Sequence, residues 1–354
     1  MAREGGGAMA MDAFLTPDDR STLLERLAGW IGDYRAGEIE RPDAGHVARW
    51  VGQFDPAERD AVLAETAYAL GQFYYPRRAV EGWLDRLIDD PGFAGADPSN
   101  FWRSVGFLKL QRRSRSQHQM LELLNQCLRR RLGFEAGRSA PANGVFLYLD
   151  DGIFSGNQVR WDLRNWMLTG GMRGVTVRIV AVGVHRSGHQ WADQGIASLA
   201  RDRQIRVEWW SLREIEDRRS HLSRSEVLRP TFLPDDEYVA SWRAHFEKRG
   251  GRFVPRPAGG PERVGPFSSE AGRQVLEQAF LRKGAFIFAL PQSPDPDMRP
   301  LGYSRFASVG FGTLFTTWRN CPNNAPLVLW WGDPFQGHPL DLWYPLLPRR
   351  IRGV

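Results

Sequence analysis

The middle of the chain alternates short apolar runs with segments of helical pattern, and this alternation restricts the fold more than any other feature. Strand-length apolar runs cover residues 144–149, 174–184 and 205–210, while helical patterns cover residues 159–168 and 190–201. This order is typical of parallel sheets, because each return to the starting edge needs a crossover that a helix provides. Abundant valine and isoleucine in residues 174–184 favours a buried central strand. The sequence therefore predicts an α/β fold with a parallel sheet flanked by helices.

Residues 16–100 differ from this core, because their apolar residues recur at helical spacing throughout. One helix is predicted to begin at Thr16, where a proline at the first helical position and the acids after it are typical of an N-terminus. Three more helices follow the apolar stripes near residues 47–54, 62–74 and 80–88. These stripes are interpreted as core positions and predict an N-terminal helical domain.

The start of the chain and its cysteine content bear on location. Residues 1–15 are rich in glycine and alanine, lack the apolar segment of a secretory signal and are expected to be disordered. No apolar run reaches the ~20 residues that a membrane-spanning helix needs. Two cysteines, Cys127 and Cys321, are too few for a disulfide framework. These features predict a cytoplasmic protein with no membrane partner.

The remaining chain divides into a predicted sheet core, residues 101–226, and a C-terminal segment, residues 227–354, that completes or covers it. The elements predicted in the C-terminal segment are helices over residues 237–248 and 268–283 and strands over residues 285–290 and 327–331. The second of these helices is expected to end at Gly284, since glycine is common just after a helix.

The charge is basic and unusual in its make-up. Lysine and arginine number 47 against 41 acidic residues, giving a net charge of +6, and only Lys109, Lys248 and Lys283 are lysines. A GC-rich genome produces such an arginine excess without any function. Arginine also binds phosphate well through its planar fork. Basicity alone therefore leaves nucleic acid, a nucleotide or no special partner equally open.

One motif carries the chemistry. The apolar run Val145–Leu149 leads into the adjacent acids Asp150 and Asp151, and a loop, Gly152–Gln158, then turns into a helix. Ligands of open α/β sheets bind at the carboxyl ends of strands, and a loop leading into a helix N-terminus favours an anion. Two carboxylates beside a phosphate would repel it, so they are expected to face sugar hydroxyls or a bridging Mg²⁺. The alternative is a simple strand-to-helix turn with an acid that caps the helix.

This motif resembles the phosphoribosyl-pyrophosphate signature of type I phosphoribosyltransferases. The resemblance implies that Asp150 and Asp151 form the catalytic pair, hold the ribose hydroxyls and contact a substrate-bridged Mg²⁺. It further implies that the 5′-phosphate is bound by the loop residues Gly152, Ser155, Gly156, Asn157 and Gln158. The chain departs from the signature at Gln158, where the family prefers threonine, and at Phe154, where a hydroxyl residue is common.

A wider resemblance covers most of residues 45–335. Gln53-Phe54, Phe107–Leu110 with Ser116-Gln117, the acidic-pair loop, and the run from Arg319 to Asn324 with Leu329–Trp331 are similar to a bacterial phosphoribosyltransferase-like family linked to conflict, or anti-phage, systems. This resemblance implies a type I phosphoribosyltransferase-like sheet and an effector role in defence. It also implies a protein partner that is encoded nearby.

Two further groups of residues are candidates for the same site. A basic loop, Arg112, Arg113 and Arg115 with Ser116, precedes a predicted helix over residues 117–132 and is expected to neutralise a diphosphate; its alternative is an exposed basic loop. His185 follows the strand over residues 174–184 and is predicted to contact the ligand.

Three functions remain open from the sequence. The first is an enzyme, a phosphoribosyltransferase or nucleotide glycosyl hydrolase, that binds a phosphoribosyl-pyrophosphate-like or nucleotide ligand with Mg²⁺ and acts at the anomeric carbon of ribose. The second is a catalytically inactive nucleotide-sensing module that regulates a partner protein, which the lack of a recognisable flexible catalytic loop favours. The third is a basic scaffold that binds nucleic acid through its arginines.

Overall fold

The computed structural model describes residues 17–111, 116–170, 172–259, 265–304 and 308–349. The segment expected to be disordered, residues 1–15, lies outside this range. The first helices are α1 (Pro17–Trp30), α2 (Ala44–Val51), α3 (Arg59–Phe73), α4 (Arg77–Asp89), α5 (Pro91–Ala94), α6 (Pro98–Ser104) and α7 (Ser116–Leu132). The later ones are α8 (Asn157–Thr169), α9 (Arg186–Asp202), α10 (Glu237–Lys248), α11 (Glu270–Ala289) and α12 (Leu327–Trp330), with 3₁₀ turns at Arg219–Arg224 and Leu340–Leu342.

Three of the N-terminal helices, α2, α5 and α6, begin at aspartate caps. The Asp43 side chain accepts a hydrogen bond from the His46 amide at the start of α2, and Asp97 accepts one from the Asn100 amide at the start of α6. Such bonds satisfy amides that have no partner within the helix. Behind the first cap, Val47 and Trp50 are fully buried on one face of α2. The predicted N-terminal helical region is therefore confirmed.

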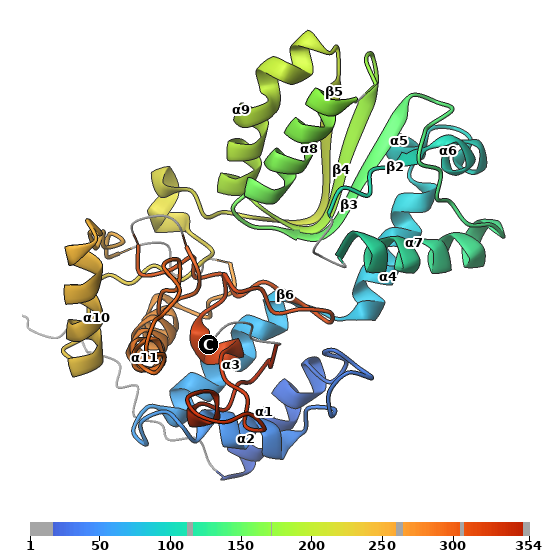
Figure 1. The fold of residues 1–354 in the computed structure, drawn as a ribbon. Helices are drawn as coiled ribbons and strands as arrows, with labels where there is room; N and C mark the ends of the chain where they lie inside the picture. The colour runs from blue at the N-terminus through green and yellow to red at the C-terminus, as the bar shows by residue number, and fades with distance from the viewer. Residues whose placement is uncertain (1–16, 112–115, 171, 260–264, 305–307, 350–354) are drawn as a thin grey trace, which may run out of the picture.

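The sheet has four parallel strands in the order β2 (Gly106–Phe107), β3 (Val145–Ile153), β4 (Thr176–His185) and β5 (Arg206–Ile215). Alternate residues of β3 enter different cores: Phe146 and Tyr148 pack with α8 and α9, whereas Leu147 and Leu149 pack with the helices of the other face. Figure 1 shows α8 and α9 along one face of the sheet. A sheet covered on both faces explains why its strands read as continuous apolar runs, and the predicted α/β fold is confirmed.

Two predicted strands are helical instead. Residues 285–290, expected to form a strand, belong almost entirely to α11, which continues past Gly284 to Ala289. Gly284 does not end the helix; a Cβ there would lie 2.5 Å from the carbonyl oxygen of Pro300, so glycine permits a close approach. Because this end of α11 is buried, it is apolar and resembles a strand in sequence. Residues 327–331 likewise form the single-turn helix α12, entered from Pro326, not a strand.

The C-terminal residues pack onto the N-terminal helices. The indole of Trp50 donates to the carbonyl of Val328 at 2.8 Å, and a ring nitrogen of His46 lies 2.7 Å from the carbonyl oxygen of Leu346. A second sheet joins the same regions, since β1 (Tyr74–Tyr75) pairs in parallel with β6 (Thr316–Thr317). In Figure 1 the segment around β6 passes between the sheet and the helical region.

Candidate functional site

The acidic pair lies near the C-terminal end of β3, in the middle of the sheet. Asp150 is in register with Ala181 of β4, and Gly152 with Gly183. Both aspartates are buried. The position follows from the sequence, because five apolar residues form the buried strand and the two acids continue it to its carboxyl end.

Ser116, at the start of α7, joins the two carboxyl groups. Its hydroxyl contacts Oδ1 of Asp150 and lies 2.7 Å from Oδ1 of Asp151. On the other side of Asp150, the side-chain amide of Gln111 donates to Oδ2 at 2.6 Å. Ser116 was predicted to belong to the ligand site, and the structure brings it to the acids.

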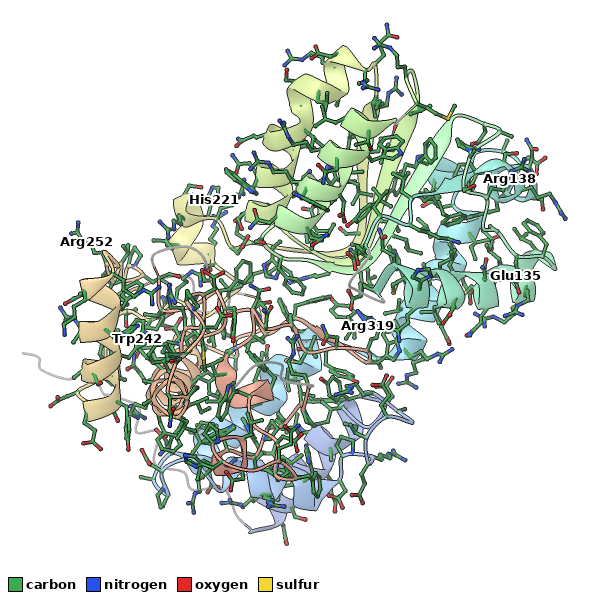
Figure 2. The ribbon with its side chains drawn as sticks, in the orientation of Figure 1. Glu135, Arg138, His221, Trp242, Arg252 and Arg319 are labelled. Atoms are coloured by element: carbon green, nitrogen blue, oxygen red, sulfur yellow. The ribbon has the colours of Figure 1, made fainter. Side chains whose placement is uncertain are left out.

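Arg319 contacts Asp151 from a distant part of the chain. Its Nε and Nη2 atoms lie 3.0 and 2.9 Å from Oδ2 of Asp151, and its Nη1 donates to Oε1 of Gln119 at 2.8 Å. Figure 2 shows Arg319 between the sheet and the helical region. A planar guanidinium fixed by both partners is held in one orientation.

The two carboxyl groups differ in protonation. Burial, with repulsion from Asp151 next, raises the pKa of Asp150 to about 8. Burial acts against ionisation of Asp151 too, but the charge of Arg319 and hydrogen bonds from Asp150 and Ser116 outweigh it and lower the pKa of Asp151. At neutral pH the pair is thus one neutral acid and one carboxylate, as close carboxyl pairs generally are.

A count of protons agrees with this assignment. The hydroxyl of Ser116 has a single proton, yet its oxygen contacts both carboxyl groups. If Ser116 donates to the ionised Asp151, the contact with Asp150 needs a proton on that carboxyl group. The neutral Asp150 supplies it, so the chain Asp150–Ser116–Asp151 has a donor and an acceptor at each step.

The loop after the pair turns tightly into α8. Gly156 caps the helix with a φ of 72°, and a Cβ there would lie 2.0 Å from the carbonyl oxygen of Gly188 in α9. The amide of Asn157 lies 3.5 Å from the Ser155 hydroxyl. The side-chain amide of Gln158 donates to Asp162 along the helix at 2.8 Å. In this arrangement the Gln158 side chain is bound to its own helix.

His185 lies apart from the acidic pair, in an aromatic enclosure. It is completely buried, its ring centroid is 4.9 Å from that of Phe311, and its Nε2 lies 3.0 Å from the Thr313 hydroxyl. Its Nδ1 faces Oδ2 of Asp217 at 3.5 Å. The structure therefore surrounds this predicted ligand contact with protein side chains.

One segment covers both positions. We call residues 313–320 the C-terminal strap. Thr313 contacts His185 near its start, and Arg319 contacts Asp151 near its end. Between them the ring of Phe315 lies over the strand ends, where Cβ atoms added to Gly183 and Gly152 would meet it at 2.4 and 3.2 Å.

The residues that lie at the acidic pair in the structure are only partly those predicted from the sequence. Arg112, Arg113 and Arg115 lie outside the described residues. Gln111 and Arg319, which hold the acids, were not predicted as site residues. Gln111 adjoins the basic loop that was singled out, whereas no local pattern links Arg319 to an aspartate 168 positions away.

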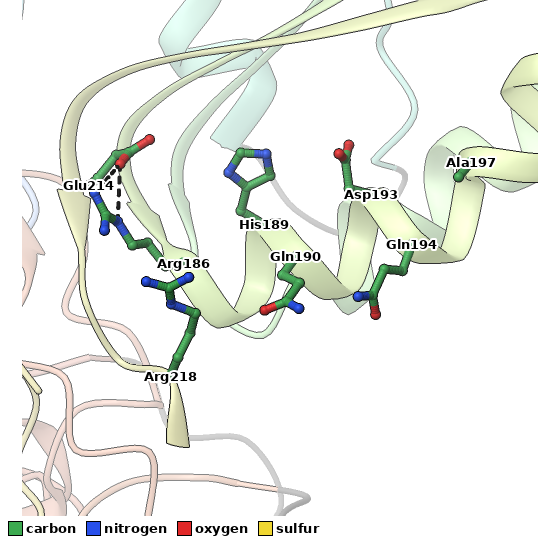
Figure 3. Close-up of a pocket in the computed structure, with 8 residues that line it drawn as sticks. All are labelled: Arg186, His189, Gln190, Asp193, Gln194, Ala197, Glu214 and Arg218. Carbon is green, nitrogen blue, oxygen red and sulfur yellow. Dashed lines mark hydrogen bonds and ion pairs between the residues drawn. The ribbon is translucent and has the colours of Figure 1, made fainter. Parts of the chain in front are cut away.

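Two open spaces lie near the sheet. A cavity of about 240 Å³ between α7, the loop after α1 and the strap is lined by Arg319, Trp318, Gln119 and Arg35, and of these residues Arg319 contacts Asp151. A larger groove, about 570 Å³, lies at the start of α9. There Arg186 pairs with Glu214, and Figure 3 shows the Arg218 side chain beside Arg186. These arginines are neutralised by acids, Arg218 by Glu216.

The acidic pair offers carboxyl oxygens, which are the kind of ligand that Mg²⁺ takes in proteins. Within the described ranges, no group of three or more His, Cys, Asp or Glu side chains is arranged to hold a metal. Mg²⁺ bound through one or two carboxylates and substrate oxygens needs no such group. Asp150 and Asp151 therefore fit a cation that the substrate helps to hold.

Of the helices described, none has the length and apolar content to cross a bilayer.

A parallel sheet flanked by helices, with an acidic pair and a glycine-containing loop at its carboxyl edge, is consistent with a phosphoribosyltransferase-like fold. The chain belongs to the PRTase-CE family, whose model matches residues 47–349. The predicted family is thereby confirmed, and it supports a phosphoribosyltransferase-like function. Comparison with curated proteins and with solved structures found no match.

Proposed function

We propose that the protein is a phosphoribosyltransferase-like effector that binds a phosphoribosyl-pyrophosphate-like or nucleotide ligand, with Mg²⁺, at the carboxyl edge of β3. The reaction is substitution or hydrolysis at the anomeric carbon of ribose. The bond from that carbon to its leaving group breaks, and a bond to an acceptor or to water forms. Membership of the PRTase-CE family supports the class of ligand.

The observation that carries this proposal is the joining of Asp150 and Asp151 at the end of a central strand, with Ser116 between them. Carboxylates at such a position accept hydrogen bonds from the two hydroxyls of a ribose. The turn at Gly156 begins α8, and the N-terminus of that helix would attract a phosphate group of the ligand. Ser155 and the amides of Gly156 to Gln158 are the donors proposed for that phosphate.

The residues of the site act by position and charge. Asp150 and Asp151 would hold the sugar and the Mg²⁺ ion, which when bound offsets the charge of the leaving pyrophosphate. An ionised carboxylate beside the ribose also stabilises positive charge that develops on the ring as the bond breaks. The buried ring of Phe315 and the half-buried ring of Phe154, which contact each other, would help to exclude water from the strand ends.

The test is calorimetric titration of phosphoribosyl pyrophosphate with MgCl₂ into the full chain and into the Asp150→Asn/Asp151→Asn variant. We expect the variant to lose affinity by at least about 100-fold, because it removes the charge-assisted hydrogen bonds of the ionised Asp151, about 1.5–3 kcal/mol each, together with the acidic oxygens that would hold the cation. The matched control is Asp18→Asn/Asp19→Asn, an adjacent and exposed aspartate pair in the first turn of α1. Circular dichroism establishes that all three proteins are folded.

Two results would contradict the proposal. One is a folded wild-type chain that binds neither phosphoribosyl pyrophosphate nor a nucleotide in the presence of Mg²⁺. The other is an equal loss of affinity in the variant and in the Asp18/Asp19 control, which would indicate a general charge effect.

A second candidate is a nucleotide-sensing module without chemistry. The pairing of Asp151 with Arg319 and the covering of the strand ends by the strap favour it, because both restrict access to the anomeric carbon. Pyrophosphate release separates the candidates. Release during incubation with phosphoribosyl pyrophosphate and potential acceptors supports the enzyme, and tight binding without release supports the sensor.

The role in anti-phage defence, with a partner protein encoded nearby, is proposed from the resemblance to conflict-system proteins. It predicts that cells with the protein and its genomic neighbours resist phage, and that Asp150→Asn/Asp151→Asn removes this resistance. Equal plating of phage on cells with the wild-type and variant proteins would contradict it.

A further inference from the structure

The strap contains a positively charged residue, Arg319, that contacts the acidic pair. Arg319 approaches Oδ2 of Asp151 with two nitrogens at about hydrogen-bonding distance, and in the described part of the chain no other Lys or Arg lies within 4 Å of either carboxyl group. The side chains of Arg319 and Asp151 are 18% and 12% exposed. The guanidinium of Arg319 thus lies where Mg²⁺ and a ribose are proposed to bind.

The rest of the strap blocks the same edge. The ring of Phe315 would collide with any Cβ at Gly183, at 2.4 Å, so the ring lies directly on the backbone of β4. Thr313 bonds to His185, the residue that ends β4. Three side chains of one segment therefore contact the ends of the two central strands.

The far side of the strap is fixed to the N-terminal helical region. The Trp318 amide donates to the carbonyl of Tyr75 at 2.9 Å, and the Arg35 amide donates to the carbonyl of Trp318 at 2.6 Å. Residues 316–317 pair with β1 in the same place. A displacement of the strap at Arg319 would therefore disturb backbone contacts of the helical region.

We propose that the strap is a latch: Arg319 closes the ligand site by acting as an internal counter-ion of Asp151, and the incoming ligand with its divalent cation opens the site by displacing Arg319. This inference rests on the proposed function for the ligand. It adds that binding is coupled to release of the strap from β1, so that the helical region senses whether the site is occupied. Such coupling requires that the ligand bind the open and closed states with different affinities.

The test uses Arg319→Gln, with Arg243→Gln as the matched control, because Arg243 is exposed and pairs with an exposed glutamate within α10. Hydrogen exchange of the strap and of Tyr75–Arg77 is measured first, without any ligand. We expect at least tenfold faster exchange in Arg319→Gln and no change in the control. Arg319→Lys, which keeps the charge but cannot contact Asp151 and Gln119 with a planar fork, is the second variant in case the first does not fold.

Binding of phosphoribosyl pyrophosphate with MgCl₂ is measured next. Because the apparent dissociation constant scales inversely with the fraction of open protein, we expect at least tenfold tighter binding by Arg319→Gln. Unchanged strap exchange in both Arg319 variants, or weaker ligand binding by them, would overturn the latch; the second result would make Arg319 a ligand contact. If no protein binds the ligand, the proposed function fails, and the exchange data alone decide whether Arg319 holds the strap.

Discussion

The sheet region and the region built from the two chain ends are constructed differently. Residues 145–215 supply three of the four parallel strands and both helices of one face, so neighbours in space are mostly neighbours in sequence. The other region joins α1–α3 to residues near the C-terminus, and Tyr34 bonds to a carbonyl 313 positions away. The candidate site therefore lies where β3 of the local region meets the strap of the other region; we call this contact the seam.

The largest effect is expected in the region built from distant segments. Trp50→Ala removes a fully buried indole that contacts Phe54 and Phe280 and bonds to Val328. Loss of this packing should lower the free energy of unfolding by about 4 kcal/mol in a denaturant titration. Trp161→Ala, in a residue of α8 that is 62% exposed, is the control and should change it by less than about 0.5 kcal/mol. Equal losses would mean that the two chain ends do not depend on this contact.

A smaller effect is expected where the helices of the sheet region meet. Gly188→Ala would place a Cβ 1.9 Å from the carbonyl oxygen of Phe154, so the loop before α8 must shift. We expect a loss of about 3 kcal/mol in unfolding free energy. Gly137→Ala, with no atom within 4 Å of its added Cβ, is the control. A tolerated Gly188→Ala would show that the loop does not need this close approach.

The pH dependence of the unfolding free energy tests the protonation of Asp150 at the seam. The pKa of Asp150 is raised to about 8, so its contribution to stability is fully present below the unfolded pKa of 3.8 and is lost as the pH rises through 8. The unfolding free energy of Asp150→Asn, measured relative to wild type, should therefore increase steadily as the pH rises from 4 to 8.5, because only the wild type loses stability by giving up this proton. A difference that does not vary with pH would contradict the assignment of the proton to Asp150.

An opposite slope is expected for Glu216. Burial works against its ionisation, but hydrogen bonds and charge from Arg218 outweigh burial, so the pKa of Glu216 is lowered. Its stabilising contribution is present above the unfolded pKa and is lost as the pH falls through the folded pKa. Glu216→Gln should therefore lose stability relative to wild type as the pH rises from 3 to 6. The two variants together distinguish a buried proton at the seam from a general effect of pH.

The smallest effect is expected for the arginines of the surface. Arg130 pairs with Asp85 and is half exposed. Arg130→Gln should change the unfolding free energy by less than about 0.5 kcal/mol, because exposed ion pairs contribute little. It should also leave binding of the chain to duplex DNA unchanged. A large loss of DNA affinity at low salt would instead favour the nucleic-acid scaffold.

The sequence predicted the fold of the local region closely. β3 and β4 lie where apolar runs were found, because strands buried on both faces are apolar along their whole length, whereas the edge strand β5 overlaps the predicted strand but is mostly half-buried. The same rule led to a wrong prediction of a strand at residues 285–290, because a helix end that is buried on several sides is equally apolar. An apolar composition indicates that a segment is buried, but it does not show whether that segment is a helix or a strand. The domain boundaries at residues 101 and 226 remain predictions.

The candidate site was predictable to the same extent. Asp150, Asp151 and the loop to Gln158 occupy consecutive positions, so their order along the chain indicates a strand end and a helix start. The partners of the pair are different, because contacts of Asp151 with Ser116 and Arg319 span 35 and 168 positions. No periodicity relates residues so far apart.

The sequence by itself determined a parallel α/β sheet with two adjacent carboxyl groups at the end of a central strand, since strand length, burial and motif order are all local properties. Only the tertiary structure decided which carboxyl group keeps its proton, that Arg319 neutralises the other and that the strap covers the strand ends. The physical reason is that ionisation of a buried acid depends on charges and hydrogen bonds within a few ångströms. Chain folding, and not sequence separation, sets those distances.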